Sequence, residues 1–342
     1  MPENVSVRNG AITMRATCQW GLSILLSCGA LLAGDFPKAE ISNRVIRAEL
    51  MLPDARRGSY RGTRFDWSGI ISSLQYAGHE YFGQWYEKHD PLIHDAITGP
   101  VEEFLTDEAG LGYKEAAPGE SFVRIGIGAV NKPNEKAYRR FETYDIADPG
   151  VWTIRKGRDW IEFTHKLATR NGYAYIYRKK LRLARDKPEL IIEHSLKNTG
   201  RKIIDSLQYN HNFFVIDRET VGPDVAIRFS FPPRARRPLS NGVEIKGEQI
   251  AFSHELQKGE SFFSELDGFG AEAKDYDFRI ENLKTGAGVH VTCDRPLERM
   301  YFWCMRTVAS AEPYVKLDVE PHREARWTLK YDFYTMAQSS AK

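Results

Sequence analysis

Cysteine is scarce in this sequence, with only four among its 342 residues. Cys18 and Cys28 fall in the first 34 residues, whose composition differs from that of the remainder. Cys293 and Cys304 are then the one pair that a disulfide would join, and nothing requires them to pair. The sequence alone leaves a single disulfide and two free thiols equally open.

An excess of charge of either sign is also missing. The chain has 48 basic and 46 acidic residues, which gives a net charge of +2. This balance gives no electrostatic reason to expect nucleic acid or an anionic membrane as a partner. The hydrophobic fraction of 42% and the aromatic fraction of 12% are too high for an intrinsically disordered chain. We therefore expect a globular protein with a large core.

Long apolar runs are limited to one, over residues 20–32. It is shorter than the ~20 apolar residues that a comfortable membrane-spanning helix needs. Two arginines precede it and the small residues Ala33 and Gly34 follow it, a pattern that predicts a secretory signal peptide over residues 1–34. We expect cleavage near Ala33 or Gly34 and a secreted or periplasmic protein.

An alternative for this leader is lipid modification at Cys28, in the sequence Leu-Leu-Ser-Cys. A lipid on Cys28 would tether the protein to a bacterial membrane, although the leucine just before Ser27 fits that signal poorly. No later segment is apolar enough to span a membrane, so we expect no transmembrane segment.

Helical periodicity is the last absence, because no long segment has apolar residues at helical spacing. From Tyr173 onward, strand-like runs over 173–183, 190–196 and 203–214 follow one another, with turns between them. We expect three consecutive antiparallel strands here. Later segments also alternate apolar and polar residues, and turn signals such as Asn-Gly and Lys-Gly recur. The sequence therefore predicts a nearly all-β protein, with residues 35–342 as one large domain.

A histidine ends the third of these runs, in the sequence Tyr-Asn-His-Asn-Phe-Phe over residues 209–214. Alternation along the strand places Tyr209, His211 and Phe213 on the more apolar face and Asn210 on the opposite face. A lone histidine on an apolar face is usually a core residue that a neighbour satisfies. Here the flanking aromatic side chains are typical of a floor on which a sugar ring lies, so His211 is a candidate for chemistry.

A polar, aromatic stretch over residues 79–104 has the composition of a binding loop. It contains His89, Asp90, His94 and Asp95, which are residue types that bind zinc. Their spacing matches no helical metal motif, so we expect sugar-contacting or solvated groups rather than a metal site. His94 is the better binding candidate because it lies closer to the following Gly-Pro turn.

Nucleotide and serine-hydrolase motifs are not present. The glycines of residues 124–128 lack the spacing of a dinucleotide-binding loop, and we expect a glycine-bearing strand there. The chain has no Gly-x-Ser-x-Gly elbow and no P-loop.

Two carboxylates near strand ends are further candidates. Glu312 stands at the predicted start of the next-to-last strand, where a solvated loop carboxylate is an equally good interpretation. Asp275 opens another predicted strand and could bind sugar hydroxyls, a weak signal by itself.

Taken in order, these segments resemble the galactose mutarotase (aldose 1-epimerase) superfamily and its hexose-phosphate epimerase relatives. The resemblance rests on an Asn-Thr-Gly turn followed by the Asn-His-x-Phe-Phe-like sequence at His211, on Asp275-x-x-Phe278, and on Glu312 ahead of a proline-led turn. It implies that His211 and Glu312 are the catalytic pair. The arginine and Leu-His-Gly-Gly motifs of the mutarotase branch are absent, and Arg64, Arg124 and His94 are the nearest substitutes in kind.

The resemblance implies a large antiparallel β-sandwich and acid–base chemistry at a sugar hemiacetal, with no metal and no organic cofactor. An ionised Glu312, with an ordinary pKa of ~4.3, would take the anomeric hydroxyl proton, and a protonated His211 would give one to the ring oxygen. Asn210, Asp275, Arg64, Arg124 and His94 would hold the sugar or oligosaccharide. This interpretation requires His211 and Glu312 to face each other across a cleft that fits a pyranose ring.

Two alternatives remain open at this point. The first is a carbohydrate-binding protein that has kept the groove and lost the chemistry. The second is a polysaccharide lyase, which ranks lowest because the sequence shows no basic cluster beside His211 to neutralise a uronate.

Overall fold

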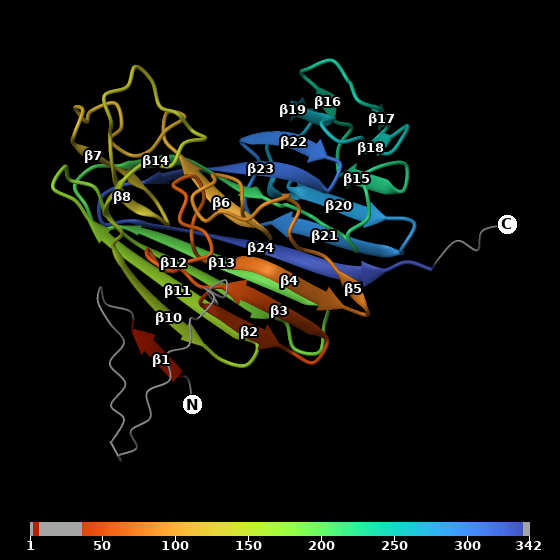
Figure 1. Cartoon of the computed structure of the whole chain (residues 1–342), viewed down its shortest axis with the longest axis horizontal. Coiled ribbons are helices and arrows are strands. Elements are labelled where there is room, and N and C mark those ends of the chain that lie inside the picture. The colour runs from red at the N-terminus through yellow and green to blue at the C-terminus, as the bar shows by residue number, and fades with distance from the viewer. Residues whose placement is uncertain (1–2, 7–35, 338–342) are drawn as a thin grey trace, which may run out of the picture.

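The computed structural model describes residues 3–6 and 36–337, and most of its regular structure is antiparallel β-strand (Figure 1). No α-helix occurs in these ranges, and the one helical element is a 3-10 turn, η1 (Ala273–Asp275). The prediction of a nearly all-β protein is therefore confirmed.

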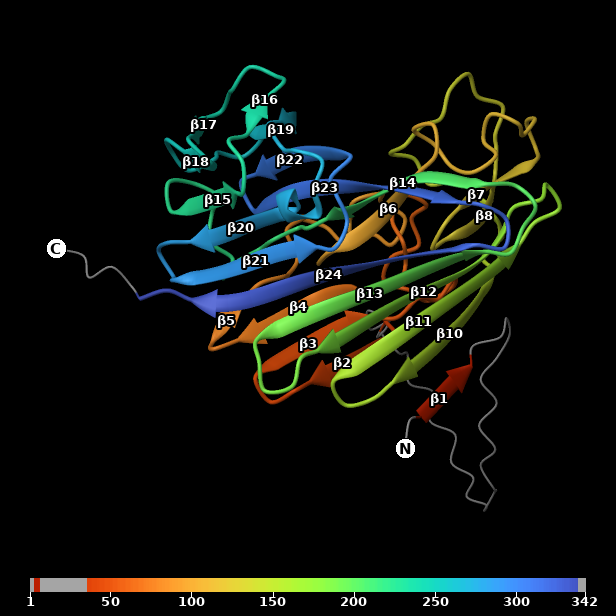
Figure 2. The ribbon, with the colours of Figure 1, turned by 180° about the vertical axis from the view of Figure 1, so that it is seen from behind.

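The largest sheet has eleven strands, and Figure 2 shows its central part from behind. In spatial order they are β1 (Glu3–Ser6), β10 (Val151–Lys156), β11 (Trp160–Ala168), β12 (Ala174–Leu183), β13 (Glu189–Asn198), β24 (Glu324–Thr335), β21 (Ala287–Cys293), β20 (Asp277–Asn282), β15 (Val225–Phe229), β18 (Gln249–Phe252) and β17 (Val243–Lys246).

A second sheet of six strands carries the residues of interest below. Its order is β16 (Arg234–Ala235), β19 (Ser261–Asp267), β22 (Arg299–Met305), β23 (Val308–Val319), β14 (Ile204–His211) and β6 (Val101–Leu105). Two small sheets complete the fold: β2 (Lys38–Ser42), β3 (Ile46–Met51), β4 (Ile70–Tyr76) and β5 (His79–Glu80) in one, and β7 (Ser121–Arg124), β8 (Gly128–Asn131) and β9 (Ile146–Asp148) in the other.

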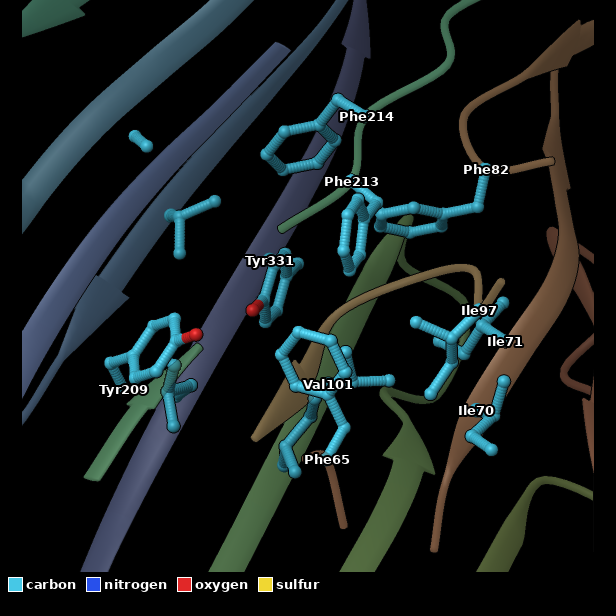
Figure 3. Close-up of a cluster of buried hydrophobic side chains, with 14 of the residues drawn as sticks. Phe65, Ile70, Ile71, Phe82, Ile97, Val101, Tyr209, Phe213, Phe214 and Tyr331 are labelled. Atoms are coloured by element: carbon cyan, nitrogen blue, oxygen red, sulfur yellow. The ribbon is translucent and has the colours of Figure 1, made fainter. Parts of the chain in front are cut away.

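The two larger sheets pack face to face, as alternation along their strands requires. Buried and less buried residues alternate along β12, β13 and β24, so one face of each strand enters the core. Contacts between the layers include the Tyr331 hydroxyl of β24, which donates a 2.7 Å hydrogen bond to Asn212 beside the end of β14. Figure 3 shows Tyr331 among Phe65, Val101 and Phe213 in this core. The predicted β-sandwich is confirmed.

The predicted run of three consecutive strands is wrong in its third member. β12 and β13 pair as expected, but β13 pairs next with the C-terminal strand β24. β14 crosses instead to the six-stranded sheet, where it lies between β23 and β6. Alternation reports that a strand has a buried face, and it does not report which strand is its neighbour.

Two predicted segments have different local structure. The end of the expected loop over 79–104 is β6, all five residues of which are buried. The expected glycine-bearing strand over 124–128 is a hairpin, because β7 ends at Arg124 and β8 begins at Gly128. Gly126 has a φ of 78°, a conformation suited to a turn, and a Cβ there would lie 2.5 Å from the Asp66 carboxylate.

Cys293 and Cys304 are both buried and free, so the structure selects two thiols over a disulfide. The predicted leader over residues 1–34, including Cys28, lies outside the described residues except for β1, which pairs with β10. Within the described ranges, no helix has both the length and the apolar character to cross a membrane.

Candidate active site

Strands β14 and β23 bring His211 and Glu312 together. The register pairs Tyr209 with Tyr314, so antiparallel continuation sets His211 beside Glu312 two residues farther along. The His211 Nε2 atom lies 3.2 Å from Glu312 Oε1, and the side chains are 5% and 4% exposed. Glu312 occupies the middle of β23 rather than its start. The two residues that the resemblance selected are thus direct neighbours.

Aromatic rings enclose the histidine. Phe213 stacks on the His211 ring with centroids 3.7 Å apart and an interplanar angle of 5°. Trp303 and Phe65 meet the imidazole edge to face, at centroid distances of 5.3 and 5.7 Å. The expected aromatic side chains therefore surround His211, and one of them, Phe213, stacks on the imidazole itself.

The second imidazole nitrogen is held by Ser310. Ser310 Oγ lies 2.9 Å from His211 Nδ1 and accepts a 3.0 Å hydrogen bond from the Asn212 backbone N–H. With one lone pair used, the serine hydroxyl proton is free to point at Nδ1, which leaves the other nitrogen to face Glu312. Ser310 thus fixes the ring orientation.

The expected pyranose-sized gap between His211 and Glu312 is absent, because 3.2 Å is a contact distance. A sugar would have to lie alongside the pair rather than between its members. Among the described residues, the Glu312 carboxylate has no hydrogen bond or ion pair other than its contact with His211. Its remaining lone pairs are therefore free for a ligand.

Burial also changes the expected protonation of the pair. It raises the pKa of Glu312 to about 7, although the positive charges of Arg64 and Arg140 oppose that rise. Burial lowers the pKa of His211 well below its ordinary value, and the same two arginines act in the same direction. Near pH 7, the expected charged pair is therefore replaced by a neutral imidazole beside a carboxyl group that is only partly ionised.

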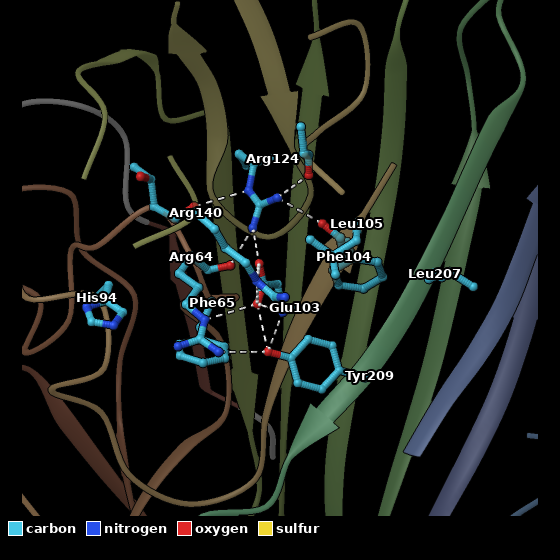
Figure 4. A network of polar contacts seen from close by, with 12 residues as sticks. Arg64, Phe65, His94, Glu103, Phe104, Leu105, Arg124, Arg140, Leu207 and Tyr209 are labelled. Atoms are coloured by element: carbon cyan, nitrogen blue, oxygen red, sulfur yellow. Dashed lines mark hydrogen bonds and ion pairs between the residues drawn. The ribbon is translucent and has the colours of Figure 1, made fainter. Parts of the chain in front are cut away.

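A cluster around Glu103 lies on the same sheet face and was not predicted (Figure 4). The Glu103 carboxylate binds Arg64 at 3.1 Å, Arg124 at 2.9 Å and Arg140 at 2.8 Å. It also accepts a 2.7 Å hydrogen bond from the Tyr209 hydroxyl. Although burial alone would raise the pKa of Glu103, the three guanidinium groups hold it well below its usual range. Glu103 is thus a permanent anion.

Arg124 has no capacity left for a substrate. Its guanidinium is buried, and its N–H groups donate to the Glu103 carboxylate and to the backbone carbonyls of Thr63, Arg64, Phe104 and Ala109. An arginine has five N–H donors, and all are used here. The prediction that Arg124 binds the sugar is therefore corrected: it positions Glu103 and the chain around Arg64.

Arg64 and His94 do lie toward the open side of the cluster. The Arg64 guanidinium is 4.4 Å from the centre of the Phe65 ring and 5.1 Å from that of Phe141. The His94 ring lies 4.9 Å from the same Phe141 ring, and Phe141 is 61% exposed. Both predicted binding residues therefore surround one exposed aromatic side chain near Glu103.

Asn210 faces the other way. Its side-chain amide donates a 3.0 Å hydrogen bond to Glu102, on the side of β14 and β6 that packs against the large sheet. Glu102 also contacts Lys179 and His194, and all three side chains are fully buried. The prediction that Asn210 binds the sugar is corrected, because alternation along β14 turns it away from His211.

Asp275 is also outside the site. It ends the 3-10 turn η1, and its carboxylate accepts a hydrogen bond from the Glu272 backbone N–H at 3.2 Å. No described contact connects it with His211, Glu312 or the Glu103 cluster. The predicted sugar-binding role is replaced by a capping role before β20.

Arg140 and Glu103 are the functional candidates that sequence reasoning missed. Glu102-Glu103 inside the apolar segment of β6 was an available signal, because alternation makes at least one of two successive strand glutamates face inward. Arg140 lies between β8 and β9 and had no such signal. Within the described ranges, no group of three or more His, Cys, Asp or Glu side chains is arranged to hold a metal ion.

Comparisons with known proteins support the fold. No protein-family profile matches the sequence, and no curated protein gives a significant match. Among solved structures, a putative aldose 1-epimerase from Escherichia coli K12 has a TM-score of 0.55 at 12% identity, over 87% of this chain and 99% of that one. A galactose mutarotase related enzyme from Lactobacillus acidophilus gives 0.54 at 13% identity, over 89% and 100%. An aldose epimerase homologue from C. elegans gives 0.53 at 12%, over 88% and 99%. The fold is galactose mutarotase-like.

Proposed function

We propose that this protein is an exported carbohydrate-active enzyme that interconverts sugar anomers by acid–base catalysis, in the manner of an aldose 1-epimerase. The observation that carries the proposal is the contact between His211 and Glu312 on one sheet face, with free carboxylate lone pairs beside it. Export rests on the leader-like composition of residues 1–34.

Ring opening of a hemiacetal requires one group to take the anomeric hydroxyl proton and another to give a proton to the ring oxygen. A neutral His211 with a protonated Glu312 holds the same number of protons as an imidazolium with a carboxylate. The pair therefore supplies one acid and one base in either arrangement. After rotation of the aldehyde, the two groups exchange roles and the ring closes as the other anomer.

A direct test is NMR exchange between the α and β anomers of a panel of aldoses and uronic acids, with the spontaneous rate subtracted. We expect His211→Asn and Glu312→Gln each to reduce the catalysed rate about 100- to 10,000-fold. His254→Ala, which changes an exposed histidine, is the matched control and should retain the wild-type rate. Wild-type exchange at the spontaneous rate for every sugar contradicts the proposal, and glycan binding without turnover then supports the binding-protein alternative.

A second candidate function is a polysaccharide lyase, and the structure removes the reason for ranking it lowest. Two arginines do lie close to His211. Arg64 and Arg140 each donate a hydrogen bond to the hydroxyl of Tyr209, which precedes His211 by two residues in β14. Guanidinium groups are suited to neutralise a uronate carboxylate. A lyase would release unsaturated products that absorb in the ultraviolet, whereas an epimerase would not change the absorbance of a uronate polymer.

A further inference from the structure

The Glu103 cluster contains more positive charge than its protein partners neutralise. Three guanidinium groups surround one carboxylate that is fully buried. The charges of Arg64 and Arg140 also lower the pKa of Glu312, the acidic group that contacts His211. Even with Glu312 ionised, three positive charges face two negative ones. A buried excess charge is costly unless a counter-charge joins it.

Two of these arginines have unused donors directed away from Glu103. Arg64 uses Nε and Nη2, and Arg140 uses Nε and Nη2, to bind Glu103 and the Tyr209 hydroxyl. For neither residue does Nη1 bond to any group in the part of the chain that the structure describes. Their side chains are 10% and 26% exposed, whereas that of Arg124 is 1% exposed. Of the three arginines in the cluster, a ligand can thus reach Arg64 and Arg140 but not Arg124.

The position of these donors relates them to the acid–base pair. Tyr209 binds both guanidinium groups through its hydroxyl, and its ring centre is 6.2 Å from that of His211. The Phe65 ring is close to both groups, with its centre 4.4 Å from the Arg64 guanidinium and 5.7 Å from the centre of the His211 ring. Tyr209 and Phe65 therefore connect the arginines with the acid–base pair through direct contacts.

We propose that the substrate is a uronic acid or a uronate-terminated sugar, whose carboxylate binds Nη1 of Arg64 and Arg140 while its anomeric centre lies at His211 and Glu312. This inference rests on the function proposed above. A carboxylate is favoured because its two oxygens match the two free Nη1 groups, one on each arginine.

The first experiment measures binding, independently of turnover. Calorimetric titration at pH 7 and low salt would compare D-glucuronate and D-galacturonate with glucose, galactose and glucose 6-phosphate. We expect the uronates to bind more tightly than the neutral sugars, with an affinity that falls as salt is added. Equal binding of uronates and neutral sugars, or tighter binding of glucose 6-phosphate, overturns the proposal.

Variants of Arg140 test the contact itself. Arg140→Gln should weaken uronate binding about 10- to 100-fold, because a hydrogen-bonded charge is lost. Arg140→Lys keeps the charge and should weaken it less. Arg139→Gln is the matched control, since Arg139 is the neighbouring residue and pairs with Glu135 and Glu142. A uronate affinity that Arg140→Gln leaves unchanged contradicts the proposal, provided that thermal unfolding shows the variant folded.

Anomer exchange, measured on the same ligands, separates the two hypotheses. Uronates that bind and depend on Arg140 but are not interconverted support the carboxylate site and contradict the epimerase function. Catalysed exchange of neutral aldoses with no uronate preference supports the function and overturns the carboxylate site.

Discussion

Glu102 and Glu103 are adjacent in β6, and their carboxylates lie on opposite faces of the strand in two separate charge clusters. Glu102 binds Lys179 and His194 against the large sheet. Glu103 binds three arginines on the face that carries His211. The two-residue period of a strand thus places a buried ion cluster directly behind the candidate active site. We expect the inner cluster to act on stability, and the outer one on both stability and ligand binding.

Lys179→Met should strongly destabilise the protein. Lys179 is fully buried between Glu102 and Asp66, and its removal leaves two buried carboxylates without a cation. Breaking such a cluster costs about 3–5 kcal/mol, which denaturant unfolding would measure. Lys180→Met on the same strand is the control, because Lys180 lies over the Trp160 ring and takes no part in the cluster. Similar losses for the two variants would contradict a special role for the inner cluster.

Acid should unfold the protein through the same glutamates. Burial alone would raise the pKa of Glu102, but Lys179 and His194 hold it at about 2, and arginines hold that of Glu103 low as well. A carboxyl group with a lowered folded-state pKa stabilises the fold above its unfolded pKa of ~4.3 and loses that contribution as the pH falls toward the folded value. We expect the free energy of unfolding to fall steeply between about pH 4 and pH 2. A flat profile there would contradict the two clusters.

How far sequence reasoning succeeded depended on the kind of contact. Alternation identified the strands and the apolar face of His211, because a strand's burial is a local property. Glu312 was found only through the order of motifs in the resemblance, and its contact with His211 depends on strands 101 positions apart in the chain being neighbours in one sheet. Arg140 lies in the segment between β8 and β9, whereas Glu103 lies in β6, and no sequence pattern relates the two segments. Long-range charge pairing leaves no periodic signal in the sequence.

Asp275 provides a test of one such failure. Motif order suggested a sugar ligand, whereas in the structure the Asp275 carboxylate accepts a hydrogen bond from the backbone N–H of Glu272, the residue that precedes η1. Asp275→Ala should therefore lower the free energy of unfolding by about 0.5–2 kcal/mol, the usual cost of a lost cap, and leave sugar affinity and exchange rate unchanged. Calorimetric titration and NMR exchange on the variant would measure both. A large loss of sugar affinity would restore the role that the motif suggested.

Glu312→Gln should remove activity while increasing stability in alkaline solution. Because burial raises the pKa of Glu312 to about 7, the carboxyl group stabilises the fold below its unfolded value near 4.5, and this contribution is lost as the pH rises toward 7. A glutamine does not titrate and avoids burying a charge. At pH 8 the variant should be up to about 3 kcal/mol more stable than the wild type, and the difference should shrink toward pH 5. A variant that is less stable at pH 8 would contradict a buried carboxylate whose only described contact is a neutral imidazole.

The pH dependence of catalysed exchange should report the single proton that His211 and Glu312 hold between them. Above about pH 7, where the buried Glu312 carboxyl group ionises beside a neutral imidazole, the pair loses its acid and the catalysed rate should fall about tenfold per pH unit. Below the lowered pKa of His211, the pair gains a second proton and loses its base. Arg140→Gln should move the alkaline limb to higher pH, because its guanidinium charge lowers the pKa of Glu312. Arg139→Gln should leave the limb in place, since Arg139 pairs with Glu135 and Glu142. A rate that rises through pH 8 would mean that the fully deprotonated pair is active, which would contradict the acid–base roles assigned to both residues.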